Sequence, residues 1–166
     1  MRHIRQWSTA IVVGTALTVT ACASDGDARP KVPSALVAAA TPLRSVNVVV
    51  HRSPTCSCCG GWQDAVRAAG ATVTEEHHAD VTGIKETLKV PKDQRSCHTS
   101  VIGGYVVEGH VPVLAIQQLL ERKPNVDGIA LAGMPAGAPG MPGAQTGPLL
   151  VTTIDDGQVV GEFGRY

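Results

Sequence analysis

The stretch VVVHRSPTCSCCGGWQDAVRAAG, residues 48–70, decides the fold. It opens inside an apolar, β-branched run, which predicts a buried strand over 46–51. From Trp62 onward apolar residues recur at helical spacing, and Gly70 is well placed to end that helix. The loop between strand and helix holds three cysteines: Cys56, Cys58 and Cys59. The stretch therefore predicts a strand, a sulfur-rich loop and a helix.

The remaining segments predict a mixed α/β domain. They indicate in order a strand, a short helix, a hairpin, an amphipathic helix, a Gly/Pro loop and a terminal hairpin: 71–78, 82–90, 99–111, 112–123, 131–147 and 148–166. In the short helix we expect Ile84 and Leu88 to face inward. The first β-α-β unit should form a right-handed parallel crossover. This order predicts a thioredoxin-like fold, with a mixed sheet flanked by helices and a C-terminal β-hairpin.

The N-terminus has the pattern of an export signal. Arg2 and Arg5 precede an apolar run over 10–21, which is short for a membrane span. The tetrapeptide VTAC resembles a lipobox and predicts a lipidated Cys22, although ACA also fits ordinary signal cleavage. We expect a signal over 1–22 and a periplasmic or cell-envelope location, with the membrane reached only through a lipid anchor on that cysteine.

Composition separates a tether from the folded domain and excludes one class of partner. Residues 23–45 are small, polar and aperiodic, which favours a flexible tether. The domain is therefore expected over 46–166. The formal net charge is +0 and basic residues do not cluster, so no nucleic-acid surface is predicted.

A fourth cysteine is expected to join the loop cysteines. Cys97 lies just before the third predicted strand, which in a thioredoxin-like sheet places it opposite the first loop. Structural disulfides are one interpretation of four such thiols in an exported domain. Cys58 and Cys59 are adjacent, so a fully bonded scheme would have to tie one of them to Cys97. That scheme is cramped.

Two functional interpretations remain. Cys56 and Cys59 form a C-x-x-C pair, which is typical of thiol–disulfide oxidoreductases. Against it, Cys58 sits inside the motif, and no proline precedes the third strand, where thioredoxins place one. The other interpretation is a soft-metal site, because thiolates select Cu(I), zinc or iron–sulfur clusters. The spacing lacks paired zinc knuckles and iron–sulfur patterns, so it favours several Cu(I) ions sharing bridging thiolates.

Four motifs together, CSCCGGW, SCHT, YVVEGHVP and GMPAGAPGMP, resemble the CopG-like family of bacterial copper-resistance proteins. The resemblance covers 46–163. It implies a thioredoxin-like periplasmic domain with a cysteine-bridged copper cluster, whose ligands here would be Cys56, Cys58, Cys59 and Cys97. It also implies copper handling, either as a copper oxidoreductase that interconverts Cu(I) and Cu(II) or as a passive buffer. Expected partners are copper ions and periplasmic copper chaperones or efflux components.

Further side chains are candidate ligands with a structural alternative for each. Met134 and Met141 lie in the Gly/Pro loop, and their thioethers could bind Cu(I) or anchor the loop by packing. His98 could ligate a metal or orient Cys97 by a hydrogen bond. His110, at a strand-to-helix turn, is a weaker candidate.

Overall fold

The computed structural model describes residues 43–166. The predicted signal, Cys22 and most of the tether lie outside this range. Leu43 falls within the predicted tether, yet its side chain is buried and its N–H donates to the carbonyl of Ala69 at 2.9 Å. In the part of the chain that is described, no helix is long and apolar enough to cross a bilayer.

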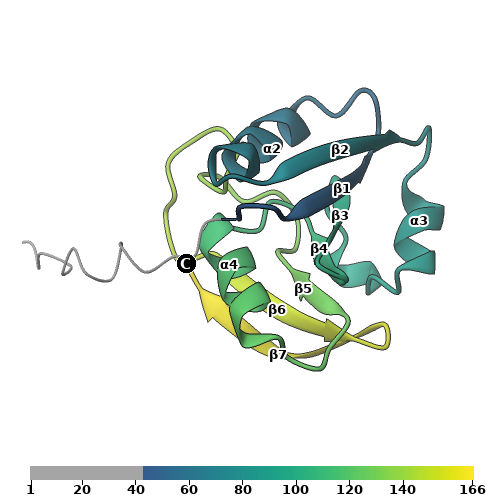
Figure 1. Cartoon of the computed structure of the whole chain (residues 1–166), viewed down its shortest axis with the longest axis vertical. Coiled ribbons are helices and arrows are strands. Elements are labelled where there is room, and N and C mark those ends of the chain that lie inside the picture. The colour runs from purple at the N-terminus through teal and green to yellow at the C-terminus, as the bar shows by residue number, and fades with distance from the viewer. Residues whose placement is uncertain (1–42) are drawn as a thin grey trace, which may run out of the picture. The chain divides into compact units, whose positions relative to one another are not determined.

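Seven strands form one mixed sheet in the order β2-β1-β3-β4-β5-β6-β7 (Figure 1). The first strand is parallel to β2 and antiparallel to β3; β4 is parallel to β5, and the other neighbours are antiparallel. The strands span Asn47–Arg52 (β1), Thr72–His77 (β2), His98–Ile102 (β3), Tyr105–Glu108 (β4), Gly128–Ala130 (β5), Leu150–Asp155 (β6) and Gln158–Arg165 (β7). The sequence pattern did not predict β5, which is three residues long.

Two helices pack on one face of the sheet. They are α2, Cys58–Ala68, and α4, Val113–Arg122, and both contribute to the larger hydrophobic core. Gly70 follows α2 with φ +103°, a conformation that favours glycine, so the predicted stop signal acts as expected. The core is closed by apolar side chains of several elements: Val48, Val50, Trp62, Val66, Ile102, Ile116, Leu119 and Val151.

The third helix, α3 (Thr82–Thr87), belongs to the opposite face, next to a short 3-10 helix over Lys92–Gln94. Leu88 packs there against a smaller apolar cluster of Val90, Val106, Ala130 and Ile154. Ile84 and Leu88 are both half-buried, and Leu88 faces inward as expected. The fully buried residue of α3 is the charged Lys85, which the apolar pattern did not predict.

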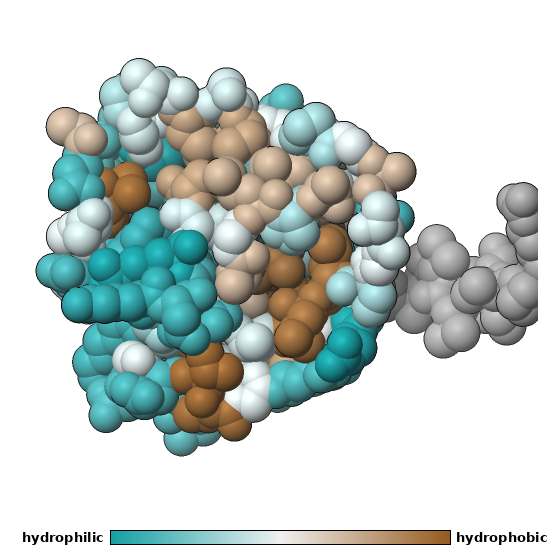
Figure 2. Space-filling model, turned by 180° about the vertical axis from the view of Figure 1, so that it is seen from behind, coloured by the Kyte–Doolittle hydropathy of each residue, from teal (hydrophilic) through white to brown (hydrophobic). Residues whose placement is uncertain are grey.

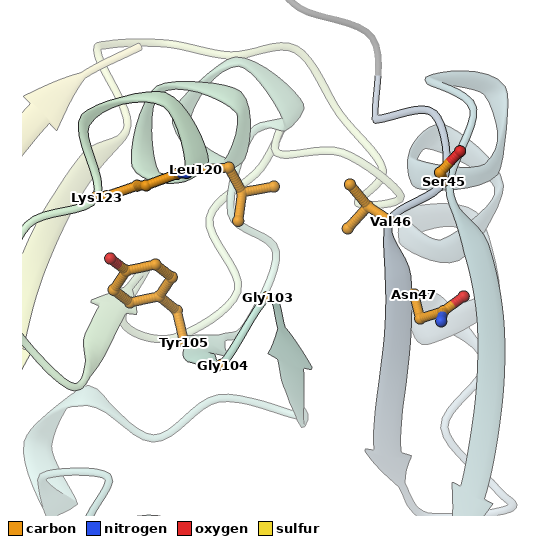
Figure 3. Close-up of a pocket in the computed structure, with 8 residues that line it drawn as sticks. All are labelled: Ser45, Val46, Asn47, Gly103, Gly104, Tyr105, Leu120 and Lys123. Atoms are coloured by element: carbon orange, nitrogen blue, oxygen red, sulfur yellow. The ribbon is translucent and has the colours of Figure 1, made fainter.

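A pocket of about 720 Å³ lies at the amino end of β1 (Figure 3). Its lining comes from the start of β1, the β3–β4 turn and the end of α4. The cysteine loop follows the other end of this six-residue strand, and a rise of about 3.3 Å per residue places the two ends roughly 17 Å apart. Seen from behind, the molecule shows hydrophobic side chains in patches bordered by hydrophilic ones (Figure 2).

Candidate metal centre

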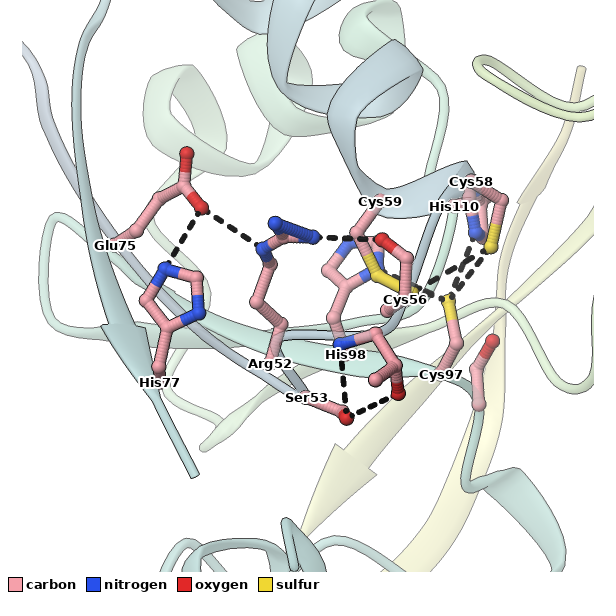
Figure 4. The surroundings of a disulfide bond; sticks show 12 residues. Arg52, Ser53, Cys56, Cys58, Cys59, Glu75, His77, Cys97, His98 and His110 are labelled. Atoms are coloured by element: carbon pink, nitrogen blue, oxygen red, sulfur yellow. Dashed lines mark hydrogen bonds and ion pairs between the residues drawn. A yellow bond between two sulfur atoms is a disulfide. The ribbon is translucent and has the colours of Figure 1, made fainter. Parts of the chain in front are cut away.

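Arg52, the last residue of β1, fixes the cysteine loop (Figure 4). Its Nη1 donates to the carbonyl oxygen of Cys56 at 2.6 Å, and its Nε donates to Glu75 of β2 at 2.8 Å. The chain then enters α2 directly, with Cys58 and Cys59 as the first two helical residues. The loop is thereby held between the neighbouring strand and the helix.

The structure brings all four predicted cysteines together. Their sulfur atoms lie within 4.8 Å of one another. The Sγ of Cys97 is 3.8 Å from that of Cys58 and 3.7 Å from that of Cys59, and the Sγ atoms of Cys56 and Cys58 are 3.6 Å apart. The antiparallel register of β1 and β3 explains the meeting, because it pairs Arg52 with His98, the residue after Cys97.

Cys56 and Cys59 form a disulfide, with 5.7 Å between their Cα atoms. Cys58 and Cys97 are free thiols. The bonding therefore differs from the fully bonded scheme considered from sequence, which would have used Cys97. Two-electron reduction of this disulfide would leave four thiols in one cluster.

Two histidines contact the Cys97 sulfur. Nε2 of His110 lies 2.9 Å from it, and Nδ1 of His98 lies 3.2 Å from it. Nδ1 of His110 donates to the carbonyl of Pro139 at 2.8 Å, so in the neutral ring Nε2 is free to accept the S–H of Cys97. Burial, together with the neighbouring Cys58, raises the pKa of Cys97 to about 12. The metal-free site therefore holds Cys97 as a neutral thiol.

His98 is fully buried on the α2 side of the sheet, where its ring lies 4.6 Å from that of Trp62. Burial, with smaller effects from His110 and Lys85, lowers its pKa to about 3. Its Nε2 has no hydrogen-bond partner among the described residues, so either neutral tautomer leaves a ring nitrogen unpaired or weakly paired. The other ring nitrogen, Nδ1, is the one that lies beside a sulfur, 3.2 Å from the Sγ of Cys97.

A buried ion pair, which the sequence pattern did not predict, supports the Cys97 segment. Nζ of Lys85 lies 2.6 Å from Oε1 of Glu108, and both side chains are buried. The same carboxylate accepts the backbone N–H of Ser96 at 2.6 Å, and Lys85 also donates to Thr99. The sequence held one sign of this ion pair, which is that the apolar strand Tyr105–Glu108 ends in a glutamate.

The Gly/Pro loop covers the start of α2. At Gly140, which has φ +80°, an added Cβ would clash with the backbone nitrogen of Trp62, so the close approach requires glycine. Met141 follows and packs against the core, whereas Met134 is 53% exposed. Their predicted role as copper ligands stays a prediction, as does that of His98.

Comparisons with known proteins agree with this geometry. The family model described as a protein of unknown function, DUF411, matches residues 94–141. A comparison with curated proteins found no significant match. Among solved structures, form 2 of the copper resistance protein CopG is 39% identical and covers 73% of this chain and 98% of its own, with a TM-score of 0.67. Form 1 of the same protein is 38% identical, and the match covers 72% of this chain and 96% of that one, with a TM-score of 0.66. The chain therefore belongs to the CopG family of copper resistance proteins.

Proposed function

We propose that the protein binds several Cu(I) ions as a thiolate cluster and acts in copper resistance. The observation that carries the proposal is the convergence of four cysteine sulfurs within 4.8 Å from two distant segments. Soft sulfur donors select Cu(I), and a C-x-C-C spacing suits thiolates that are each shared between ions. The ligands would be Cys56, Cys58, Cys59 and Cys97. Copper is here the cargo, and its positive charge would let four clustered thiolates coexist.

The chain's own groups support uptake of copper in three ways. Reduction of the Cys56–Cys59 disulfide by an external dithiol, which gives up two electrons and two protons and becomes a disulfide itself, frees two more sulfurs. His110 lies beside the thiol of Cys97 and can accept its proton as the sulfur becomes a ligand. The loop that holds Gly140 lies against α2 and limits access of water to the sulfurs.

The fold context is consistent with this role. We infer a thioredoxin-like arrangement from the strand order β2-β1-β3-β4, with β1 and β2 parallel and the other two pairs antiparallel. In that arrangement the loop after β1 is the place for redox or metal chemistry. We further propose export to the periplasm, anchoring through a lipid on Cys22, interconversion of Cu(I) and Cu(II), and exchange of copper with periplasmic chaperones or efflux components.

One observation favours a second function, thiol–disulfide exchange. The disulfide joins Cys56 to Cys59, the C-x-x-C pair that an oxidoreductase would use. However, the Sγ of Cys58 lies 3.6 Å from that of Cys56, where it would compete with Cys59 for a mixed disulfide on Cys56. Its attack on the Cys56 sulfur would expel the substrate thiol and leave a Cys56–Cys58 disulfide in place of the Cys56–Cys59 one. This proximity makes the copper function the better supported of the two.

The test is anaerobic loading of the reduced full chain with Cu(I), with Cys22→Ser as background so that only the four clustered cysteines offer thiols. We expect more than one copper ion per chain and cooperative uptake. Each of the changes Cys56→Ser, Cys58→Ser, Cys59→Ser and Cys97→Ser should lower the number bound. Uptake of one ion or fewer, together with rapid reduction of insulin disulfides that Cys58→Ser accelerates, would instead establish the oxidoreductase.

A further inference from the structure

A second group of metal-binding side chains gathers on the opposite face of the sheet from the cysteines. In the parallel register, His51 of β1 pairs with Glu76 of β2, while Arg52 pairs with His77. Successive strand residues point to opposite faces, so His51 and Glu76 share one face and Arg52 and His77 share the other. Arg52 faces the cysteine loop. His78 follows β2 and lies beside His51 and Glu76.

The three donor atoms of this group converge. Nδ1 of His51 lies 3.2 Å from Nε2 of His78 and 3.2 Å from Oε2 of Glu76, and the last two atoms are 4.0 Å apart. Ligand atoms around a tetrahedral ion with bonds of about 2.0–2.2 Å lie roughly 3.3–3.6 Å apart. The observed spacing is close to this, so small side-chain rotations would bring all three atoms onto one ion.

A comparison with Glu75, the preceding residue of β2, shows that the carboxylate of Glu76 is available to a metal ion. Glu75 is held by Arg52 at 2.8 Å and by Arg67 at 3.4 Å. Among the described residues, Glu76 has no lysine or arginine partner, and its ion-pair contacts are His51 and His78. Two imidazole nitrogens and one carboxylate oxygen that no lysine or arginine holds therefore face one point, and this donor set suits a borderline divalent cation.

The three side chains of this group differ in how far they are exposed to solvent. The side chain of His51 is 9% exposed, that of His78 is 31% exposed and that of Glu76 is 55% exposed. The buried ring is preset by its strand, and the two outer ligands can admit an ion from solvent. We propose that His51, Glu76 and His78 form a second metal site, separate from the sulfurs, that takes a borderline divalent ion and binds Cu²⁺ most tightly among the common ones.

This proposal goes beyond the Cu(I) function and is tested independently of it. The full chain carries Cys22→Ser, Cys58→Ser and Cys97→Ser, while the Cys56–Cys59 disulfide is retained, so no thiol remains to reduce Cu²⁺. Cu²⁺ is titrated and followed by calorimetry and by electron paramagnetic resonance. We expect one Cu²⁺ per chain, with hyperfine coupling to two nitrogens, and displacement by excess Zn²⁺.

The variants His78→Ala and His77→Ala give a matched comparison of adjacent histidines on the same strand end. Loss of an outer hydrogen-bond partner costs about 10–100-fold in metal affinity, so loss of the ligand His78 should weaken Cu²⁺ binding by about 100-fold or more and remove one nitrogen coupling. His77→Ala should change the dissociation constant by less than about twofold.

Glu76→Gln provides a second, near-isosteric variant. It should weaken binding by about tenfold or more and leave both nitrogen couplings in place. Equal weakening by His77→Ala and His78→Ala, a nitrogen count other than two in the parent, or binding at millimolar Cu²⁺ alone would overturn the proposed site. Because this background lacks two of the four clustered cysteines, the result does not depend on whether a Cu(I) cluster forms.

Discussion

The two faces of the sheet near the end of β1 offer different donor atoms. On the α2 side stand four cysteine sulfurs with His98 and His110, and Cys59 and both histidines are fully buried. On the other side stand two imidazoles and a carboxylate, two of them partly exposed. Alternation of side chains along a single pair of strands separates the soft, buried group from the harder, open one.

The two sets of donor atoms suit different oxidation states of copper. Sulfur prefers Cu(I), and nitrogen with oxygen suits Cu²⁺. The volume of a pocket does not by itself identify a metal site. The pocket of about 720 Å³ at the other end of β1 is lined by no comparable set of metal-binding side chains. The convergence of particular atoms carries the functional inference.

The largest expected effect is the loss of stability of the metal-free protein in acid. The pKa of His98 is lowered from 6.5 to about 3, so the unfolded chain binds more protons than the folded chain between these values. Stability should therefore rise with pH across this window, and His98 alone accounts for about 5 kcal/mol. Urea unfolding from pH 3.5 to 7.5 measures this slope.

Substituting one histidine on each face of the sheet separates their contributions to the pH dependence of stability. His98→Asn should flatten the pH dependence strongly. His51→Asn, on the other face, should flatten it less, because Glu76 raises the pKa of His51 and opposes the lowering by burial. A full slope retained in His98→Asn would contradict the assignment of the effect to the sulfur side.

The next effect tests the ion pair of Lys85 and Glu108, which lies on the same face of the sheet as His51 because Thr99 pairs with both His51 and Glu108. Lys85→Met leaves the buried carboxylate of Glu108 unpaired, which should lower the free energy of unfolding by about 3–5 kcal/mol. The double variant Lys85→Met with Glu108→Gln should recover much of this loss, since no charge is then buried. Chemical denaturation measures both values, and a single variant as stable as the parent would refute the role of the pair.

A smaller effect concerns the pH dependence of Cu(I) affinity. Cys97, with a pKa of about 12, must lose its proton to bind copper, so affinity should rise with pH by about tenfold per unit for this one proton. Competition titrations with a Cu(I) chelator between pH 6 and 8 measure the slope. In Cys97→Ser the slope should fall by about one proton, and an unchanged slope would exclude Cys97 as a ligand.

The smallest effect is expected on the outer surface of α2. Asp64 is 77% exposed and pairs with Arg67 at 3.1 Å. Asp64→Ala should change stability by less than about 1 kcal/mol, because exposed ion pairs contribute little. Thermal unfolding and a copper count should both match the parent. A reduced copper count would show that the α2 surface, and not the loop alone, shapes the sulfur site.

The sequence allowed the convergence of the four cysteines to be predicted. A β-branched strand, a helix that ends at a glycine and a later strand predict a sheet in which the segment before that later strand lies beside the first loop. Cys97 is in that segment, and the other three cysteines are in the loop. The mixed sheet followed from the same periodicities. β5 has three residues, too few for a period to be detected. Leu43 follows an aperiodic segment and comes directly after a proline, so its burial against the core had no periodic signal.

Side-chain pairing was less predictable than the placement of elements. The disulfide partner of Cys59 depends on distances between sulfur atoms, which the spacing of cysteines in the sequence does not give. In the structure this partner is Cys56. Lys85 is polar and lies in a short helix, so its burial becomes understandable only with Glu108, 23 residues later, beside it. The donor group of His51, Glu76 and His78 likewise depends on strand register.

The most direct test is anomalous diffraction at the copper edge from crystals of the reduced chain loaded with Cu(I). The account predicts more than one copper peak between the start of α2 and β3, with Cys97 and at least two of the three loop cysteines bonded to copper. A single ion bound without Cys97, or copper found solely at His51, Glu76 and His78, would contradict it.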